Sequence, residues 1–271
     1  MPRRKSPSDA SKLKQGRGTG HGKDYVPFDK VREVPSVGLS HRSKSNTTGR
    51  VQEQLSTLEH NISCILDWAK LEVREQFPLP LDETMRIAER LSIKHPTNPK
   101  TKEPWIIRLD LLVTLNSESS IREFAITAKH ANELESKRVI EKFEIERTYC
   151  TEHGIGWGIT TEREVLNGLI TNIKWVQRSG NIEDMPGLRS EDLDYYESAL
   201  LQELEAYPTT ILSHACINSD KKLGFKPGTS LWLVQHFICT RRWQIDMLEK
   251  IDTSKPFKIG RINKTAGNRN V

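Results

Sequence analysis

Two charged side chains stand out in this sequence because each interrupts or ends an apolar run. Asp110 lies within the run 105–114 (WIIRLDLLVT), and Lys129 follows the run 121–128 (IREFAITA). A carboxylate can hold a divalent cation, and a lysine ammonium can orient a water or offset charge on a pentavalent phosphorus, so the pair suits metal-assisted phosphodiester hydrolysis. The same two residues also suit an ordinary ion pair at a strand end, which on these residues alone is the commoner case.

Both residues fall on a predicted β-hairpin. Apolar side chains alternate with other side chains, as in a half-buried strand, at Ile107, Leu109, Leu111 and Val113. The polar segment NSESS that follows has the composition of a turn, and a second alternating run comes after it. If Asn116 pairs with Ile121, Asp110 lies opposite Thr127 and beside Lys129 on one face of the sheet.

A third charged residue, Glu59, borders the apolar face of a helix predicted over residues 51–70. The apolar stripe of this helix recurs at steps of three and four, at Val51, Leu55, Leu58, Ile62, Ile65 and Leu66. At about 100° per residue, Glu59 lies just outside the stripe. Its carboxylate is either directed to solvent, which is the commoner case, or aimed at a site that the apolar face borders.

The composition is that of a globular protein with room for two domains. Hydrophobic residues make up 35% of the 271 residues and charged residues 28%. No run approaches the roughly 20 apolar residues of a membrane span, and the four cysteines show neither metal spacing nor disulfide density. These features predict a reduced, cytoplasmic protein without a membrane partner.

The net charge of +5 is unevenly distributed along the chain. Residues 1–50 hold 12 basic and 4 acidic residues, and residues 221–271 hold 11 and 3, so each end carries +8. The middle, residues 51–220, holds 18 basic and 29 acidic residues. Basic ends of this kind are typical of a protein that binds a polyanion, whereas the first 15 residues are expected to be a disordered basic tail.

The segment 24–50 is expected to be a surface arm, because prolines and glycines interrupt it. The preceding GRGTGHGKD resembles a phosphate-binding loop but lacks the spacing of a Walker A motif, although a glycine-rich basic loop can still pass close to a nucleic-acid backbone. The cations predicted to bind DNA phosphates here are Lys23, His41, Arg42, Lys44 and Arg50.

The remaining periodicities predict a small α/β domain followed by helices. Strands are predicted over 71–80 and 155–160, and a helix over 131–150 whose many charges are expected to form a solvated face. Beyond the linker 179–187, helices are predicted over 190–206, 209–223 and 229–248. A basic stretch, 255–261, would form a hairpin wing, so the C-terminal part is either a winged-helix domain or a helical cap on the first domain's core.

Glu59 on a helix, Asp110 on a strand, and Thr127 and Lys129 on its hairpin partner resemble the core of the PD-(D/E)xK, restriction-endonuclease-like nucleases. The surrounding sequence is similar to a narrower family, TnsA, in the segments GRGTGHGKDYVPF, REVPSVGLSHR, TGRVQEQLSTLEHN, VREQFPLP, IKHP and FAITAKHA. The similarity runs in order over residues 16–175 with closely similar spacing. The C-terminal third matches only in general character.

The resemblance implies a restriction-endonuclease-like catalytic domain over 16–178 and a helical, winged-helix-like docking domain over 179–271. TnsA proteins are the endonuclease subunits of heteromeric cut-and-paste transposases in bacteria and nick double-stranded DNA at the 5′ ends of the transposon. A DDE transposase, TnsB, cuts and joins the 3′ ends, and an AAA+ ATPase, TnsC, regulates both. Lys94 and His95 match a family position and are expected near the DNA or the metal.

Carried over residue by residue, Glu59 and Asp110 would bind two Mg²⁺ ions, for which Mn²⁺ can substitute, and Lys129 would serve the attacking water. Thr127 departs from the Gln or Glu that is usual at its position. A threonine side chain is a poor metal ligand, so the backbone carbonyl of Thr127 would coordinate instead.

In the C-terminal part, the resemblance places the contact with the ATPase. The residues expected to form it are Trp232, Phe237, Arg241, Arg242 and Trp243, although some of these aromatics must be core. Two alternatives stay open for the whole chain. One is a catalytically weakened nuclease-fold scaffold that binds DNA in the same assembly, and the other is a standalone DNA-repair or restriction nuclease.

Overall fold

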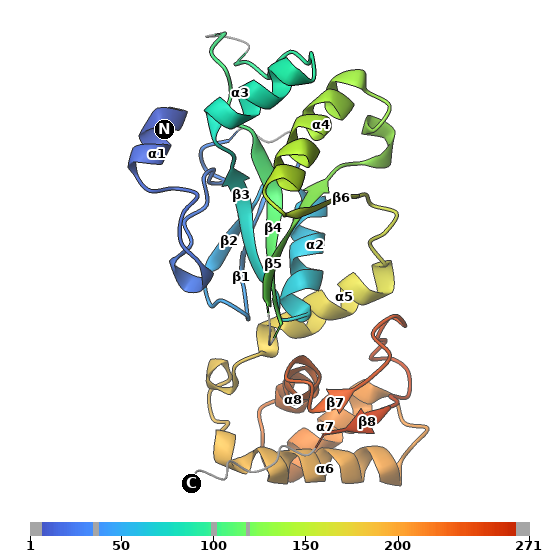
Figure 1. The fold of residues 1–271 in the computed structure, drawn as a ribbon. Helices are drawn as coiled ribbons and strands as arrows, with labels where there is room; N and C mark the ends of the chain where they lie inside the picture. The colour runs from blue at the N-terminus through green and yellow to red at the C-terminus, as the bar shows by residue number, and fades with distance from the viewer. Residues whose placement is uncertain (1–6, 35–37, 99–101, 118–119, 264–271) are drawn as a thin grey trace. The chain divides into compact units, whose positions relative to one another are not determined.

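A four-stranded sheet of order β3-β4-β5-β6 forms the centre of the first of two compact units, residues 1–165 and 166–271 (Figure 1). Its strands are β3 (Glu72–Pro78), β4 (Arg108–Ser117), β5 (Ser120–Ala128) and β6 (Gly156–Thr160). The β3–β4 and β4–β5 pairs are antiparallel, and the β5–β6 pair is parallel. The predicted α/β class with a mixed sheet is therefore confirmed. The computed structural model describes residues 7–34, 38–98, 102–117 and 120–263.

The predicted hairpin register is confirmed. Asn116 pairs with Ile121, and the pairing continues to Leu111 with Ile126. Residues 118–119 of the predicted turn lie outside the described residues. The next step along this ladder brings Asp110 level with Thr127, so alternation alone determined which side chains share the face of Asp110.

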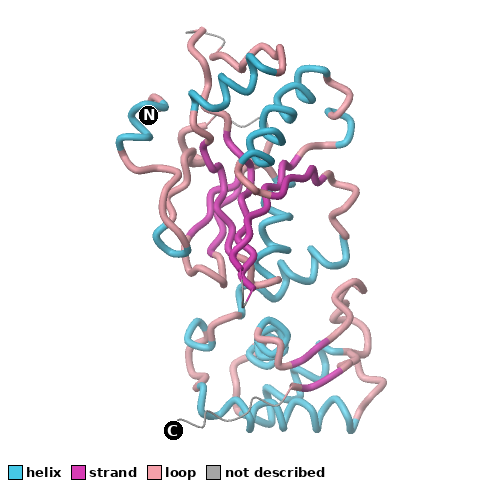
Figure 2. Tube along the Cα trace, viewed as in Figure 1, coloured by secondary structure: helices cyan, strands magenta, loops and turns pink. Residues whose placement is uncertain are grey.

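Helices cover both faces of this sheet, as the cyan coils around the magenta strands in Figure 2 show. In Figure 1, α4 (Lys137–Glu152) lies in front of the sheet and α2 (Thr57–Trp68) behind it, and α3 (Leu81–Arg90) contacts α4. One buried cluster joins sheet residues to α3 and α4 and includes Ile87, Leu109, Leu112, Ala125, Ile145 and Tyr149. Burial of this apolar area is the main force that holds the layers together.

The helix predicted to begin at residue 51 begins at Thr57 instead. Residues Val51–Gln54 form β2, which pairs with β1 (His41–Lys44). Ser56 caps α2 by accepting a hydrogen bond from the Glu59 backbone N–H at 3.1 Å. The prediction was wrong because the apolar periodicity extends past this Ser-x-x-Glu capping box, which sets the true start of the helix.

The N-terminal segments are also more ordered than predicted. Within the 15 residues expected to be disordered, α1 (Asp9–Lys14) forms, because the buried Lys12 ammonium pairs with Asp29 at 2.5 Å. Residues 1–6 of that predicted tail lie outside the described residues. The glycine-rich loop serves packing, since a Cβ on Gly18 would lie 2.2 Å from the ring of Pro78. A short 3-10 helix, Gly22–Asp24, follows this loop.

Arg50, one of the cations predicted to bind DNA, is instead part of the core of the first unit. Its side chain is 8% exposed and donates two hydrogen bonds to Glu75, at 2.7 and 2.5 Å, and one to the Val73 carbonyl at 2.7 Å. Glu75 is fully buried. The expectation that Arg50 lies on a surface arm is wrong, because a buried carboxylate far along the chain requires its charge.

The other predicted cations of this arm remain at the surface to different degrees. Lys23, Arg42 and Lys44 are exposed. His41 is half-buried, and its ring stacks on that of His60 with centroids 4.3 Å apart. Of the five cations predicted to bind DNA from this arm, three are therefore exposed.

We predict that Arg50→Ala lowers the free energy of unfolding by about 3–5 kcal/mol, because the substitution leaves the Glu75 charge buried without its partner. Urea denaturation measures the change. Lys44→Ala is the matched control, since Lys44 is an exposed cation on β1, and its loss should change the unfolding free energy by less than about 0.5 kcal/mol. Equal effects of the two substitutions would contradict the buried role of Arg50.

The second unit is mainly helical, with α5 (Asn167–Val176), α6 (Leu193–Ala206), α7 (Leu212–Leu223) and α8 (Thr229–Cys239). The boundary predicted between residues 178 and 179 is too late, because α5 contacts α8 and belongs to this unit. Short 3-10 helices occur along the chain at Ala131–Glu133, Gln177–Ser179, Ile182–Asp184 and Ser190–Asp192.

The C-terminal hairpin differs from the predicted wing. Strand β7 (Trp243–Gln244) pairs antiparallel with β8 (Arg261–Ile262), so the basic stretch 255–261 supplies only the first residue of a strand. Helix α8 ends at Cys239 rather than at residue 248, and Arg241 has a positive φ of 63° that a helix cannot continue through. Gly224 ends α7 in the left-handed conformation, as its sequence position predicted. Among the described residues, no helix is long and apolar enough to cross a membrane.

Candidate active site

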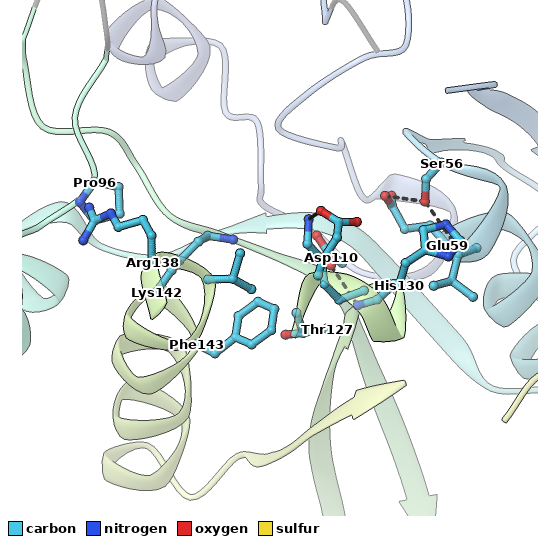
Figure 3. Close-up of a pocket in the computed structure, with 14 residues that line it drawn as sticks. Ser56, Glu59, Pro96, Asp110, Thr127, His130, Arg138, Lys142 and Phe143 are labelled. Carbon is cyan, nitrogen blue, oxygen red and sulfur yellow. Dashed lines mark hydrogen bonds and ion pairs between the residues drawn. The ribbon is translucent and has the colours of Figure 1, made fainter. Parts of the chain in front are cut away.

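A pocket of about 360 Å³ in the first unit contains all four predicted catalytic residues: Glu59, Asp110, Thr127 and Lys129. They reach it from α2, β4 and the end of β5, and α4 forms another wall (Figure 3). The sequence places these residues up to 70 positions apart. The structure therefore brings together the residues that the sequence singled out for phosphodiester chemistry.

Three hydrogen bonds fix the Glu59 carboxylate in the first turn of α2. One oxygen accepts from the Ser56 hydroxyl at 2.9 Å, and the other accepts from the Leu55 backbone N–H and the Gln76 side-chain amide, both at 3.1 Å. Gln76 lies between the pairs that join Glu75 to Leu111 and Phe77 to Leu109, so it is level with Asp110. The capping box therefore also sets the direction of a pocket carboxylate.

Asp110 lies half-buried at the floor of this pocket, where its Oδ2 accepts a hydrogen bond from the Ala128 backbone N–H at 2.9 Å. Burial raises the pKa of the Asp110 carboxyl to about 6. Burial and the nearby charge of Asp110 raise the pKa of Glu59 to about 7. Two carboxyl groups that both resist ionisation and repel each other are stabilised in their charged form by a cation between them.

The donor set fits a hard divalent cation that keeps part of its hydration. No group of three or more His, Cys, Asp or Glu side chains arranged for a metal occurs within residues 7–34, 38–98, 102–117 and 120–263. Two carboxylates are nevertheless what Mg²⁺ commonly takes from a protein, because waters and substrate phosphates supply its other ligands. Glu59 and Asp110 satisfy that requirement.

The Thr127 hydroxyl is directed away from a ligand role. It donates a hydrogen bond of 2.9 Å to Glu146 of α4, whose carboxylate is almost fully buried and also pairs with Lys142 at 2.8 Å. The charges of this helix were expected to form a solvated face, which is wrong for Glu146. The helical spacing could have indicated that Glu146 is buried. Glu146 lies on the same face of the helix as the buried Phe143 and Cys150, where an apolar residue is usual.

Lys129 lines this pocket, but its ammonium pairs with Glu133 at 2.8 Å. Its backbone N–H donates to the Thr160 carbonyl at 3.1 Å, which fixes the end of β5 against β6. Among the charges that lower the pKa of Asp110, Lys142 acts more strongly than Lys129. The sequence therefore identified one of two lysines in the pocket and missed the one that acts more strongly on Asp110.

Lys94 and His95 hold a loop beside the pocket without entering it. The His95 ring lies 3.0 Å from the Pro96 carbonyl and 3.1 Å from the Thr84 hydroxyl, and burial lowers its pKa. Pro96 lines the pocket, and the Lys94 carbonyl accepts from Arg138, which lines it as well. The contribution of this segment is therefore to position the pocket wall.

Two of the five residues expected to form a partner surface in the second unit are core. Phe237 and Trp243 are buried. The Trp243 ring N–H donates to Glu197 at 2.8 Å, and Arg242 donates to the same carboxylate at 2.6 Å. Trp232 is half-buried, stacks on His236 and lines a groove of about 580 Å³, and Arg241 is exposed.

We predict that Asp110→Asn stabilises the metal-free protein by roughly 1–2 kcal/mol at pH 8. The folded state holds the pKa of this carboxyl above 3.8, so ionisation between pH 4 and about 6 costs folding free energy that the amide avoids. Thermal unfolding in chelator at several pH values measures the gain, which should vanish near pH 4. Glu135→Gln, at an exposed carboxylate, is the control. A gain that persists at pH 4 would contradict this origin.

Comparison with known proteins points to one family. A family model described as "TnsA-like endonuclease N terminal" matches residues 70–162, and one described as "TnsA endonuclease C terminal" matches residues 164–247. "Transposon Tn7 transposition protein TnsA" from Escherichia coli is 41% identical over 169 residues, which is 62% of this chain and 61% of that relative. The similarity thus spans less than two thirds of the relative's length. The two family models follow each other along most of both units, and the chain belongs to the family of TnsA-like endonucleases.

Proposed function

We propose that the protein is a metal-dependent DNA endonuclease that nicks the 5′ ends of a transposon during cut-and-paste transposition. The observation that carries the proposal is the convergence of Glu59 and Asp110, from separate elements, in one pocket with Lys129. Family membership supports the choice of DNA as substrate. By the same resemblance, its partners are a TnsB-type DDE transposase, which processes the 3′ ends, and a TnsC-type AAA+ ATPase.

In this proposal, Glu59 and Asp110 hold Mg²⁺, as two ions, with Mn²⁺ as a substitute, and the Thr127 carbonyl completes the set. A cation held there would supply positive charge to the scissile phosphate and would lower the pKa of the attacking water. Lys129 orients that water once its ammonium leaves Glu133. The chain's own contribution is preorganisation, because hydrogen bonds from Ser56, Gln76 and Ala128 hold both carboxylates before substrate arrives.

The test is strand-specific nicking by the reconstituted assembly. Duplex DNA with a transposon end, labelled on either strand, is incubated with this protein, the transposase and the ATPase in Mg²⁺, in Mn²⁺, in Ca²⁺ or in chelator. The expected product is a nick at the 5′ end that requires Mg²⁺ or Mn²⁺ and this protein.

Two outcomes would replace the proposal. An assembly that joins 3′ ends but never nicks 5′ ends would favour a nuclease-fold scaffold, a reading to which the Lys129–Glu133 pair and the Thr127–Glu146 hydrogen bond lend support. Cleavage by the isolated protein at full rate would favour a standalone nuclease.

We predict that the exposed cations of the N-terminal arm contribute to DNA affinity through phosphates. Replacing Lys23, Arg42 and Lys44 together by Gln should reduce the slope of log K against log salt by about 2–3, because each lost phosphate contact removes about 0.9. Fluorescence anisotropy with labelled duplex DNA measures the slope. Arg147→Gln, an exposed cation of α4 that pairs with Glu144, is the control. An unchanged slope in the triple variant would remove the arm from the DNA contact.

A further inference from the structure

Lys142 is a charged residue of the pocket to which the function proposed above gives no role. It projects from α4 into the pocket wall next to Phe143, and its side chain is 38% exposed. Figure 3 shows its amine directed toward Asp110 rather than along the outer surface of the helix. Its charge opposes the rise in the pKa of Asp110 more strongly than any other neighbouring group does.

A buried carboxylate fixes this direction. Glu146, one helical turn further along α4, is 1% exposed and pairs with the Lys142 ammonium at 2.8 Å. The other oxygen of Glu146 accepts from the Thr127 hydroxyl at 2.9 Å, so the carboxylate is tied to β5 as well as to α4. A lysine held by an anchored partner has lost much of its rotamer freedom before any ligand binds.

The same helix provides an ordinary pair for comparison. Lys137 and Glu141 have the same spacing, yet Lys137 is 92% exposed and its ammonium lies 4.0 Å from the carboxylate. That geometry is typical of a solvated surface pair of little energetic consequence. The Lys142 pair differs in its buried partner, in its shorter distance and in its position on the pocket wall.

The ammonium of Lys142 has hydrogen-bond donors that its pair with Glu146 does not use. An ammonium has three N–H donors, and the ion pair with Glu146 requires only one of them. The ammonium lies at a pocket that Lys129, Glu59 and Asp110 also line. A phosphodiester that approaches metal held by Glu59 and Asp110 brings non-bridging oxygens to this wall, and these are strong acceptors for a lysine point charge.

We propose that Lys142 is a second lysine of the active site and that its ammonium contacts a non-bridging oxygen of the DNA phosphate bound in the pocket. Glu146 and, through it, Thr127 act as positioning residues for that contact. The inference rests on the proposed endonuclease function and adds to it a residue that binds the reacting phosphate on the α4 side. The threonine that departs from the family pattern thereby has a role, because its hydroxyl anchors the carboxylate that orients Lys142.

The test compares Lys142→Gln with Lys137→Gln in the full-length protein. Binding of labelled duplex DNA is measured in Ca²⁺ across a salt series, and nicking is measured in the Mg²⁺ assembly. Lys142→Gln should reduce the salt slope by about 1 and lower the nicking kcat by about 100-fold. Lys142→Arg, which keeps the charge, should retain the slope and most of the rate, and Lys137→Gln should leave nicking unchanged.

Circular dichroism and thermal unfolding check that the variants fold. If Lys142→Gln alone does not fold, the double variant Lys142→Gln/Glu146→Gln removes the charge and its buried partner together, and its salt slope serves instead. A folded variant with an unchanged slope and rate would overturn the proposal and leave Lys142 as the partner of Glu146 only. Tighter Mg²⁺ binding by Lys142→Gln, with an unchanged salt slope of DNA binding, would also overturn the proposal. The Lys142 ammonium would then only neutralise the carboxylates in place of the metal and would not contact the phosphate.

Failure of the broader function is distinguishable from failure of this inference. A wild-type assembly that does not nick DNA would count against the endonuclease function. The salt slope reports the Lys142 contact without catalysis, so a slope reduced by about 1 would still support the contact.

Discussion

Replacing Asp110 by Ala is expected to reduce nicking at the transposon 5′ ends by at least about 1,000-fold, because the carboxylate at the floor of the pocket would no longer hold the catalytic cation. Asp110 is the better choice of the two carboxylates for this test. Glu59 also completes the capping box of α2, so its loss would combine a catalytic effect with a structural one. The loss should appear in the rate of the assembled complex, while association with its partners is retained.

The fold should survive Asp110→Ala. The substitution removes one hydrogen bond acceptor from the Ala128 N–H, but β4 keeps its pairing with β3 and β5 over the rest of its length. Circular dichroism and thermal unfolding establish this, and Glu135→Ala, at an exposed carboxylate of the same unit, serves as the matched control for nicking. An Asp110→Ala protein that still nicks at the wild-type rate would remove Asp110 from the active site.

Cutting the chain after Val165 is expected to separate chemistry from partner docking. The fragment 1–165 retains the whole β3-β4-β5-β6 sheet, its flanking helices and the pocket, so it should fold with Glu59, Asp110 and Lys129 in place. The fragment lacks the groove that Trp232 lines. This groove is the remaining candidate for the ATPase contact, because Phe237 and Trp243 are buried. The fragment should therefore lose detectable association with the ATPase and with the ATPase–DNA complex in a pull-down.

The position of the cut is critical. A cut at Gly187, within the linker that the sequence indicates, would retain α5 but remove α8, against which α5 packs. Ile173 and Val176 are buried side chains of α5. We expect that longer fragment to be less soluble than 1–165, because its apolar α5 would have lost α8 as a partner. If the folded 1–165 fragment still bound the ATPase at full strength, the docking surface would lie on the nuclease unit, and the division into two functional modules would be wrong.

The expected stabilisation by Asp110→Asn and the expected loss of nicking by Asp110→Ala share one cause. Burial and the neighbouring carboxylate of Glu146 disfavour the charged form of Asp110, and the cation of the proposed function would offset this cost. In the metal-free protein the charged form of Asp110 therefore lowers the folding stability, and the same carboxylate is available to bind a cation. Such a conflict with stability is characteristic of functional residues.

The sequence by itself determined the elements that carry the chemistry. Strict alternation defined the hairpin and the register that pairs Asn116 with Ile121, because a shift of one residue would expose its apolar face. Asp110 was visible as an acid in an apolar run and Lys129 as a cation at the end of another. These patterns involve residues that are close in sequence, so they can be recognised from a single sequence without the tertiary structure.

Only the tertiary structure decided which charges are buried and what each one faces. Arg50 looks like a surface cation until Glu75, 25 residues away, is placed against it. Trp243 and Phe237 look like interface anchors until Glu197 and the neighbouring helices enclose them. A charge or an aromatic ring has no preferred environment of its own, so its role depends on partners that are distant in sequence.

Lys142 shows the same limit within the active site. In the sequence it is one of many charges on a helix with both signs, and spacing alone makes it a surface residue. Folding anchors Glu146 beneath β5 through Thr127, and that anchor turns the ammonium into the pocket with Asp110. The sequence thus singled out the carboxylates that we propose to bind metal, whereas packing of α4 against β5 decided which cations accompany them.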